Sequence, residues 1–380
     1  MSLVRLIIVA AVLSAGVMAI PCLGEEYSEW EKPCRDRIER LVRNGEVVGI
    51  AAGWITPRGR SVFGFGRIAS DGEDVPDEHT VFEIGSVTKV FTCLILAQLV
   101  EEGQLSLDTP VNDLLPADAR LPNHEGEPIR LADLATHTSG LPRLPSNLAP
   151  DLLLWPNNPY AHYTTERLYA AVRSTELLAP PGKEYRYSNF GVGLLGHVLA
   201  LQAGEDYETL VERRICRPLG LNDTTVTFRD GKERRTAKGH RGAGVPVPDW
   251  DIPVLTGAGG LRSTVHDLLR FAEAQIDPDS TPFPQAVRLT HQRRGTISKT
   301  LGIALGWHIL VQDGILWHNG QTGGYHSFVG FDPKARVGVV LLANSATDAV
   351  DACGFEVVKL LSRRPGGDSS DESSANSNAP

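Results

Sequence analysis

Strand-like runs lie at the two ends of this 380-residue chain, and turn residues separate them. Near the start, residues 47–55 and 61–68 form a hairpin pattern around a Thr-Pro-Arg-Gly turn. Helices and loops fill most of the middle. One sheet built from both ends, with an inserted mainly helical lobe, explains this order, so we predict an α+β fold in which helices flank an antiparallel sheet. Near the end of the chain the runs follow one another as in a meander: residues 305–311, 315–319, 326–331 and 337–343.

The first 24 residues are set apart by their composition. Arg5 is their only charge, and an apolar run follows it from Leu6 to Ala19. That length suits a signal peptide and is short for a transmembrane span, although an uncleaved membrane anchor is the alternative. The leader therefore predicts export, to the periplasm or to the extracellular space.

The rest of the chain is expected to form one domain followed by a short tail. Residues 25–362 alternate strand and helix patterns, whereas residues 363–380 are almost all small or polar and predict a disordered tail. Within the domain, we expect the sheet lobe and the helical lobe to meet at a seam, where catalytic groups would lie. Their boundaries are about 28–85 and 255–362 for the sheet lobe, and about 86–254 for the helical lobe.

Composition and cysteine content narrow the class of protein further. The chain is 42% hydrophobic and 22% charged, with a net charge of −9, so it offers no basic surface for nucleic acid. Cleavage after Gly24 would leave four cysteines, which allow three pairings. Cys34 and Cys353 lie in segments with amphipathic helix patterns near opposite ends of the chain, and a bridge between them is one option if those helices pack together. Cys93 fits a buried thiol. No Cys and His spacing resembles a zinc site, and we expect neither a metal nor a cofactor.

Ser86 and Lys89 stand three residues apart at the start of an apolar run with a helical pattern. On a helix these two side chains share a face and lie within reach of each other. A serine hydroxyl needs a base to become a good nucleophile, and a lysine can be that base when burial lowers its pKa. The alternative has Ser86 capping the helix and Lys89 pointing to water, because Ser-x-x-Lys arises easily by chance.

Tyr187 and Asn189 offer two further parts of a Ser/Lys mechanism. The leaving group must receive a proton, and Tyr187 can shuttle it if Lys89 lowers the tyrosine pKa. Asn189, two residues later, can orient the substrate amide.

The oxyanion needs fixed donors, and the strand at residues 315–319 can supply one. Gly320 would let a substrate lie beside that strand, and the backbone N–H groups of Ser86 and Gln321 would then form an oxyanion hole. The pattern His318-x-Gly320 is weak by itself, because the triplets that begin at His124 and His240 match it too. Only His318 follows Tyr187 and has a strand pattern.

Three other features have a plain structural interpretation beside a functional one. Gly191, Gly193 and Gly196 satisfy G-x-G-x-x-G, but no convincing βαβ unit surrounds them, so we expect them to allow close helix packing. His137 could be a catalytic base, although a histidine among turn residues is more often structural. Residues 143–163 are rich in Pro and Asn and predict a long loop at the border of a binding site.

The three motifs together resemble a known superfamily. Ser86-x-x-Lys89, Tyr187-x-Asn189 and the His318 triplet occur in the order and at the separations of the penicillin-recognising serine hydrolases. Within that group the chain is similar to the class C β-lactamase branch over about residues 28–362, and the segments 136–142 and 257–264 share the likeness. The resemblance implies that Ser86 is acylated, that Lys89 and Tyr187 share the proton transfers, and that Asn189 contacts substrate. It also implies that His318, Asn319 and Gly320 line the site.

The third motif departs from the lactamase pattern. Lactamase-type members usually carry Lys-Thr-Gly there, whereas this chain has His318-Asn-Gly. A permanent cation suits the carboxylate of a β-lactam, while a histidine is charged only part of the time near neutral pH. Some carboxypeptidases and esterases of the branch resemble this chain in having histidine.

We therefore expect an exported D-alanyl-D-alanine carboxypeptidase or endopeptidase-like enzyme that acts on peptidoglycan-type peptides. The alternatives are a class C-like β-lactamase, a carboxylesterase, and, from another class, a non-hydrolysing penicillin-binding receptor. Its expected partners are a small peptide, β-lactam or ester substrate and the cell-wall peptidoglycan, with no nucleic acid.

Overall fold

The structure is a computed structural model that describes residues 31–228, 235–242 and 244–363. The predicted leader, residues 1–24, and the predicted tail beyond Arg363 lie outside the described residues. Within those ranges, no helix is both long enough and apolar enough to cross a membrane.

Within the described residues, eight strands form one antiparallel sheet in which the two ends of the chain meet. β1 (Gly49–Thr56) pairs with β2 (Gly59–Gly66) on one side and with β12 (Val337–Ala343) on the other. The order across the sheet is β2-β1-β12-β11-β10-β9-β8-β7. The α+β architecture with a sheet built from both ends is thus confirmed. The other strands are β11 (His326–Asp332), β10 (Ile315–Gln321), β9 (His308–Leu310), β8 (Leu301–Ile303) and β7 (Gly295–Thr296).

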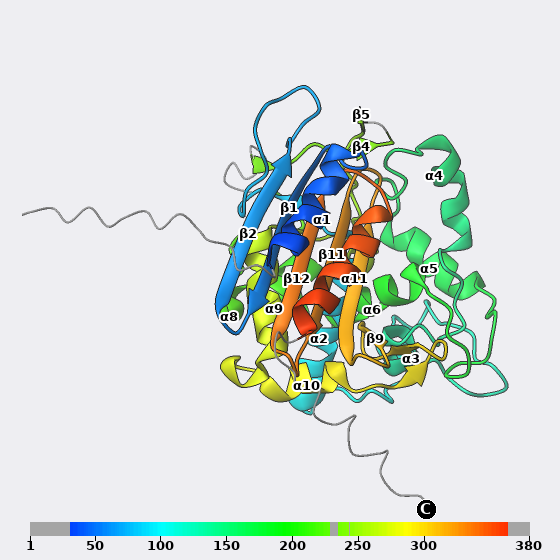
Figure 1. Ribbon diagram of the computed structural model, residues 1–380. Helices are drawn as coiled ribbons and strands as arrows, with labels where there is room; N and C mark the ends of the chain where they lie inside the picture. Colours follow the sequence, from blue (N-terminus) through cyan, green and yellow to red (C-terminus); the bar gives the residue numbers. More distant parts are fainter. Residues whose placement is uncertain (1–30, 229–234, 243, 364–380) are drawn as a thin grey trace, which may run out of the picture.

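Helices cover both faces of the sheet, and each face has its own core. α1 (Glu31–Arg43) and α11 (Ala349–Ser362) pack against each other across one face (Figure 1). Successive residues of β12 point to opposite faces, so Val339 and Leu341 pack under these two helices, while Val340 joins the core on the other side. Burying an aliphatic side chain of this kind contributes about 1.5–3 kcal/mol. The continuous apolar run of β12 therefore reflects a strand that is buried on both faces.

The second face of the sheet carries the core into the helical lobe. α9 (Val265–Ile276) contacts β1, β11 and β12, and α2 (Thr88–Glu101) contacts α6 (Asn189–Ala203) and α10 (Pro284–His291). Nearly every residue of α2 is buried, as expected for a helix that is apolar on all sides. The lobe also contains α3 (Leu131–Ala135), α4 (Ala149–Leu154), α5 (Thr165–Ser174), α7 (Tyr207–Val211) and α8 (Arg217–Leu219).

Several local features differ from the sequence-based expectations. The segment 143–163 is not all loop, because it contains a 3₁₀ turn at Ser146–Leu148 and helix α4. The hairpin β7–β8 and helix α10 extend the structure where no element was expected. Two-residue strands also occur: β3 (Phe82–Glu83) pairs with β6 (Arg262–Ser263), and β4 (His240–Arg241) pairs with β5 (Val245–Pro246). Elements this short leave little periodic signal in a sequence.

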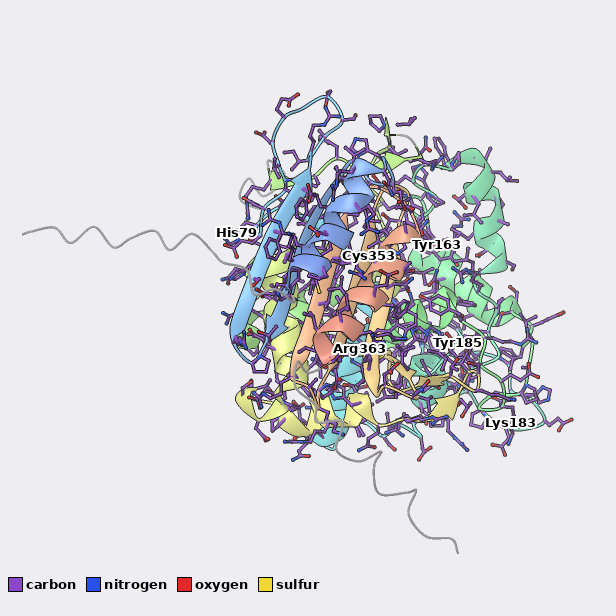
Figure 2. The ribbon with its side chains drawn as sticks, viewed as in Figure 1. His79, Tyr163, Lys183, Tyr185, Cys353 and Arg363 are labelled. Atoms are coloured by element: carbon purple, nitrogen blue, oxygen red, sulfur yellow. The ribbon has the colours of Figure 1, made fainter. Side chains whose placement is uncertain are left out.

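Cys34 and Cys353 lie on the packed helices α1 and α11, which is the arrangement that a bridge between them would need. The structure nevertheless contains both as thiols. Burial raises the pKa of the Cys353 thiol to about 12, which keeps it protonated and unreactive at neutral pH. Figure 2 shows Cys353 on α11, over the sheet. Cys93 is a fully buried thiol, as its position on the helix predicted.

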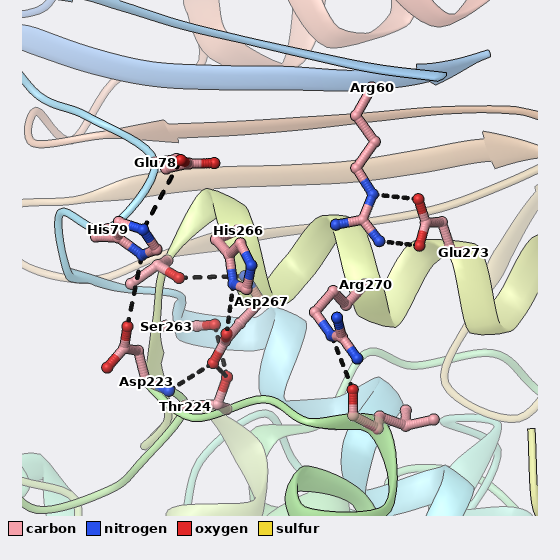
Figure 3. A network of polar contacts seen from close by, with 12 residues as sticks. Arg60, Glu78, His79, Asp223, Thr224, Ser263, His266, Asp267, Arg270 and Glu273 are labelled. Atoms are coloured by element: carbon pink, nitrogen blue, oxygen red, sulfur yellow. Dashed lines mark hydrogen bonds and ion pairs between the residues drawn. The ribbon is translucent and has the colours of Figure 1, made fainter. Parts of the chain in front are cut away.

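A buried carboxylate ties the start of α9 to the strand pair that precedes Ser86 (Figure 3). Asp267, in the first turn of α9, accepts hydrogen bonds from the Thr224 hydroxyl at 2.9 Å and from the backbone N–H of Asp223 at 2.7 Å. The Thr224 hydroxyl also contacts that of Ser263 at 2.8 Å. Because Ser263 is in β6 and β6 pairs with β3, this network holds the strand that leads into the Ser86 turn.

Candidate active site

Ser86 lies in a tight turn between strand β3 and helix α2. The turn is the 3₁₀ segment Gly85–Val87, and Gly85 has a φ of +47°, which glycine adopts at low cost. The turn is fastened to the sheet because the Ser327 hydroxyl of β11 donates to the carbonyl of Ile84 at 2.7 Å. The Ser86 side chain makes no capping hydrogen bond to the following helix. The capping interpretation of Ser86 is therefore wrong.

Lys89 is fully buried one turn after Ser86. Its Nζ lies 2.8 Å from the Ser86 Oγ and donates to the carbonyl of Ala258 at 2.5 Å. Burial lowers the lysine pKa well below its usual range, and the positive charge of Arg143 lowers it further. An amine in this state can accept the hydroxyl proton of the serine next to it. The alternative in which Lys89 points to water is wrong.

Tyr187 completes the group, but its pKa moves in the opposite direction from the one expected. Its side chain hydrogen-bonds with Ser86, and the Lys89 Nζ lies 5.0 Å from the centre of its ring. Burial is the largest influence, and it raises the pKa of Tyr187 to about 12. The condition set for Tyr187 as a proton shuttle, a pKa lowered by Lys89, is therefore not met. A phenol that keeps its proton is suited to donate it to a leaving group, while Lys89 acts as the base.

His137 holds the backbone on both sides of Tyr187. Its carbonyl accepts the N–H of Arg186 at 2.7 Å, and its ring Nδ1 accepts the N–H of Ser188 at 3.1 Å. The His137 ring also lies against the Tyr187 ring, with 4.4 Å between the centroids. Burial lowers the pKa of His137 well below its usual range, so it is neutral. These contacts favour the structural interpretation of His137 over the catalytic-base interpretation.

Asn189 begins helix α6, and its place is set by the residue before it. The Ser188 hydroxyl accepts the N–H of Gly191 at 2.8 Å, which caps the helix, and donates to the carbonyl of Pro142 at 2.7 Å. The Asn189 side chain contacts Tyr160. Its Oδ1 is buried and accepts no hydrogen bond from the part of the chain that the structure describes. A buried acceptor without a donor beside Ser86 fits a substrate N–H group.

His318 lies on β10 and is completely buried. Its Nδ1 contacts the carbonyl of Asn319 at 2.6 Å, while its Nε2 has no partner within the described ranges. Burial lowers the pKa of His318 well below its usual range, and the nearby His308 and Lys89 lower it further. The ring is therefore neutral at pH 7. It places a polar group in the site without a positive charge.

The three residues of the His318 triplet do not all face the site. Neighbouring strand residues point to opposite faces, and the side chain of Asn319 donates to the carboxylate of Asp351 on α11 at 2.6 Å. The structure therefore does not bring the Asn319 side chain together with Ser86. Gly320 faces the Ser86 turn, and His318 lies close enough to Lys89 for the lysine charge to lower its pKa.

The backbone groups expected to form the oxyanion hole lie side by side. A Cβ atom at Gly320 would lie 2.8 Å from the Ser86 nitrogen, and one at Gly85 would lie 2.8 Å from the Gln321 nitrogen. The end of β10 and the Ser86 turn are thus in backbone contact. The expected reason for a glycine at position 320 was room for substrate, whereas here it lets the strand approach the turn. Ser86, Asn189 and Gln321 all line one small cleft, together with Trp250 and Thr322.

Two residues near the site were not expected from the sequence. His308 of β9 contacts the hydroxyl of Tyr185 through its Nε2 at 3.0 Å, and its ring lies 5.1 Å from that of His318. Tyr185 is labelled in Figure 2. Arg143 is exposed, with its Cζ 5.1 Å from the centre of the Tyr187 ring. Arg143 directly follows the segment 136–142 and is the first residue of the segment 143–163 that was predicted to border a binding site, but no motif singled it out.

The alternative motif matches are not part of the group formed by Ser86, Lys89 and Tyr187. In the G-x-G-x-x-G match, a Cβ at Gly193 would lie 2.7 Å from the Leu255 side chain, and one at Gly196 would lie 2.9 Å from the backbone of Gly257. The prediction that these glycines allow close helix packing is confirmed. His240 lies in the two-residue strand β4, although the sequence around it has no strand pattern, and its ring Nδ1 contacts the carbonyl of Asn344 at 2.9 Å.

Comparison with known proteins agrees with this fold. A family model described as Beta-lactamase matches residues 34–358. The chain therefore belongs to the beta-lactamase family and to its class C-related branch. The resemblance inferred from the three motifs is confirmed.

Different relatives are named for different activities. The D-alanyl-D-alanine-carboxypeptidase/endopeptidase AmpH of Escherichia coli is 31% identical over 70% of this chain and 71% of its own. A Beta-lactamase of Pseudomonas fluorescens is 27% identical over 81% of this chain and 91% of its own. The solved octameric penicillin-binding protein homologue from Pyrococcus abyssi superimposes with a TM-score of 0.77 at 28% identity, over 88% of this chain and 78% of its own.

Proposed function

We propose that the protein is a serine hydrolase that forms an acyl-enzyme on Ser86 and acts as a D-alanyl-D-alanine carboxypeptidase or endopeptidase on peptidoglycan-type peptides. The observation that carries the mechanism is the 2.8 Å contact between the Ser86 Oγ and the Nζ of a fully buried Lys89. The similarity to AmpH supports the choice of substrate. The apolar leader supports a periplasmic or extracellular location.

The acylation step follows from the positions of three side chains. Lys89 takes the hydroxyl proton as the Ser86 oxygen attacks the substrate carbonyl, and the N–H groups of Ser86 and Gln321 stabilise the tetrahedral oxyanion. Tyr187 donates its phenol proton to the leaving group as the carbon–leaving-group bond breaks, and the Lys89 ammonium then returns a proton to the Tyr187 oxygen. The acyl group remains on Ser86 as an ester.

Hydrolysis of that ester reverses the proton transfers. A water molecule attacks the ester carbonyl while Lys89 accepts its proton, and the Lys89 ammonium then gives a proton to the Ser86 oxygen as the ester bond breaks. The product acid is released, and both side chains return to their starting states. No metal or cofactor enters these steps, because the base, the acid and the oxyanion donors all come from the chain.

A β-lactamase is the second candidate, because the Pseudomonas fluorescens relative carries that name and this chain matches it over 91% of its length. The same three side chains would open a β-lactam ring, and the two functions differ in how fast the acyl-enzyme is hydrolysed. A carboxylesterase would use the same steps on a neutral ester. A non-hydrolysing penicillin-binding receptor would form the acyl-enzyme, or bind only, without turnover.

Intact-mass measurement after brief incubation with benzylpenicillin separates the peptidase, the lactamase and the esterase. We expect a long-lived adduct on the protein and none on Ser86→Ala, as for a penicillin-sensitive peptidase. Absence of an adduct with hydrolysed penicillin in the supernatant would identify a lactamase instead. Absence of an adduct with intact penicillin would leave the esterase, which a panel of neutral esters would test.

A further inference from the structure

Arg143 is a cation held at a defined place beside the catalytic side chains. Its backbone carbonyl accepts the N–H groups of Asn189 at 2.9 Å and Phe190 at 3.1 Å, so its main chain is fixed to the first turn of α6. Its guanidinium carbon lies 5.1 Å from the centre of the Tyr187 ring. An arginine over an aromatic face is restrained by a cation–π contact while its N–H groups remain available.

Nothing in the described part of the chain neutralises this guanidinium. No carboxylate of the described residues lies within ion-pair distance of Arg143, and the residue is exposed. Two other arginines of the chain behave differently. Arg186 is 3.1 Å from the carboxylate of Glu184, and the buried Arg262 is 3.4 Å from that of Glu83.

Burial makes the other basic groups of the site harder to protonate than free side chains of their kind. Burial lowers the pKa of Lys89 and of His318 well below their usual ranges, and it lowers the pKa of His308 to about 4. The third motif therefore provides no positive charge for a substrate carboxylate. Among these groups, the permanent positive charge next to Tyr187 belongs to Arg143.

We propose that Arg143 binds a carboxylate of the substrate and makes the enzyme prefer anionic over neutral acyl donors. This proposal rests on the proposed function, because it concerns the substrate of the same site. An arginine can hold a carboxylate with two parallel N–H···O bonds, which fixes orientation as well as charge. Arg143 would thus do from the helical lobe what a cation in the third motif does in lactamase-type relatives.

The test uses two thioesters that differ by one charge. They are N-acetyl-D-alanyl-thioglycolate, which ends in a free carboxylate, and its methyl ester, which is neutral. Both deliver the same acyl group to Ser86, and release of the thiol reports turnover. The quantity compared is the ratio of kcat/KM for the anionic donor to kcat/KM for the neutral donor. This ratio cancels any change that a variant causes in the chemistry common to both.

We expect Arg143→Gln to lower this ratio by at least about tenfold, which is the loss of roughly one charge-assisted hydrogen bond. Arg143→Glu should lower it further, and Arg143→Lys should keep part of the preference. Raising the salt concentration should reduce the ratio in the unaltered enzyme but not in Arg143→Gln, because the site is exposed to solvent. Arg173→Gln is the matched control: Arg173 is an exposed arginine of α5 in the same lobe, bound to the carbonyl of Asp118, and its loss should leave the ratio unchanged.

The outcomes separate failure of this proposal from failure of the proposed function. An equal ratio in the unaltered enzyme and in Arg143→Gln, with both thioesters hydrolysed, would overturn the role of Arg143 and leave the serine hydrolase intact. An unaltered enzyme that hydrolyses neither thioester would overturn the proposed function, and the role of Arg143 would fall with it. Turnover of the neutral thioester by Arg143→Gln shows that the variant is folded.

Discussion

His137 accepts hydrogen bonds from the N–H groups on both sides of Tyr187 while its ring lies against the Tyr187 ring, at 4.4 Å between centroids. One neutral residue thus restrains the position of the phenol that serves as the proton donor. His137 has a φ of +59°, a conformation that costs energy for most side chains. The strain and the three contacts together indicate that His137 is a positioning residue.

His137→Ala is expected to lower kcat by up to about 100-fold with little change in KM, because the phenol loses its alignment but the substrate contacts remain. His137→Asn should restore part of kcat, since asparagine tolerates positive φ and offers an acceptor near the N–H of Ser188. Steady-state kinetics on the neutral thioester measures both. Unchanged kcat in His137→Ala would show that Tyr187 is held without His137.

Gly320→Ala should remove activity through the backbone contact between β10 and the Ser86 turn. The added Cβ would lie 2.0 Å from the carbonyl oxygen of Ile84 and 2.8 Å from the Ser86 nitrogen, so one of the two backbones must shift. We expect a loss of stability of at least about 2 kcal/mol and a fall in kcat/KM of more than about 100-fold. Gly72→Ala is the control, because its nearest neighbour would be 3.8 Å away. Urea unfolding and steady-state kinetics measure the two losses. Equal stability and equal kcat/KM in Gly320→Ala and Gly72→Ala would contradict this prediction.

Lys89→Met should abolish turnover and raise stability at neutral pH. The folded-state pKa of Lys89 is lowered below its unfolded value, so between these two values the unfolded chain binds more protons than the folded one. Stability therefore rises with pH across that window, and the penalty disappears above the unfolded value near 10.5. Methionine carries no such penalty. We expect kcat to fall on the order of 10⁴-fold or more.

Thermal unfolding from pH 6 to pH 9 measures this stability difference. The melting temperature of Lys89→Met should exceed that of the unaltered protein most at low pH, and the gap should narrow as the pH rises. A gap that does not depend on pH would mean that Lys89 keeps an ordinary pKa in the fold, and that its role as the base is wrong.

Asp267→Ala is expected to destabilise the strand pair β3–β6 that leads into Ser86. Removing this buried carboxylate leaves the Thr224 hydroxyl and a backbone N–H without their acceptor, which should cost roughly 3 kcal/mol. Asp279→Ala removes an exposed carboxylate paired with Arg288 and should cost less than about 1 kcal/mol. Denaturant midpoints measure both losses. Equal losses would show that the Figure 3 network does not anchor the strand pair.

Some parts of the fold and the site could be predicted because they rest on short-range patterns. Alternating and continuous apolar runs of strand length mark β1, β2 and β10 to β12, and the three-residue spacing brings Ser86 and Lys89 together on successive helical turns. The two-residue alternation of a strand also carried the information that Asn319 points away from Gly320, although the motif suggested otherwise.

Other parts depend on contacts between segments far apart in the chain. The raised pKa of Tyr187 follows from burial by several elements, and no spacing near residue 187 reports it. His308 reaches the site from β9, a strand of only three residues. Arg143 becomes a site residue through its position over the Tyr187 ring, which depends on how the segment after residue 142 packs on α6.

The location of the acyl group tests the central claim most directly. The unaltered protein and Ser86→Ala would be mixed with N-acetyl-D-alanyl-thioglycolate, quenched in acid within a second, digested and mapped by mass spectrometry. We expect the N-acetyl-D-alanyl mass on the peptide that contains Ser86, no adduct and no turnover in Ser86→Ala, and equal melting temperatures for the two proteins. An acyl group on another peptide, or thioester turnover that persists in Ser86→Ala, would contradict Ser86 as the nucleophile.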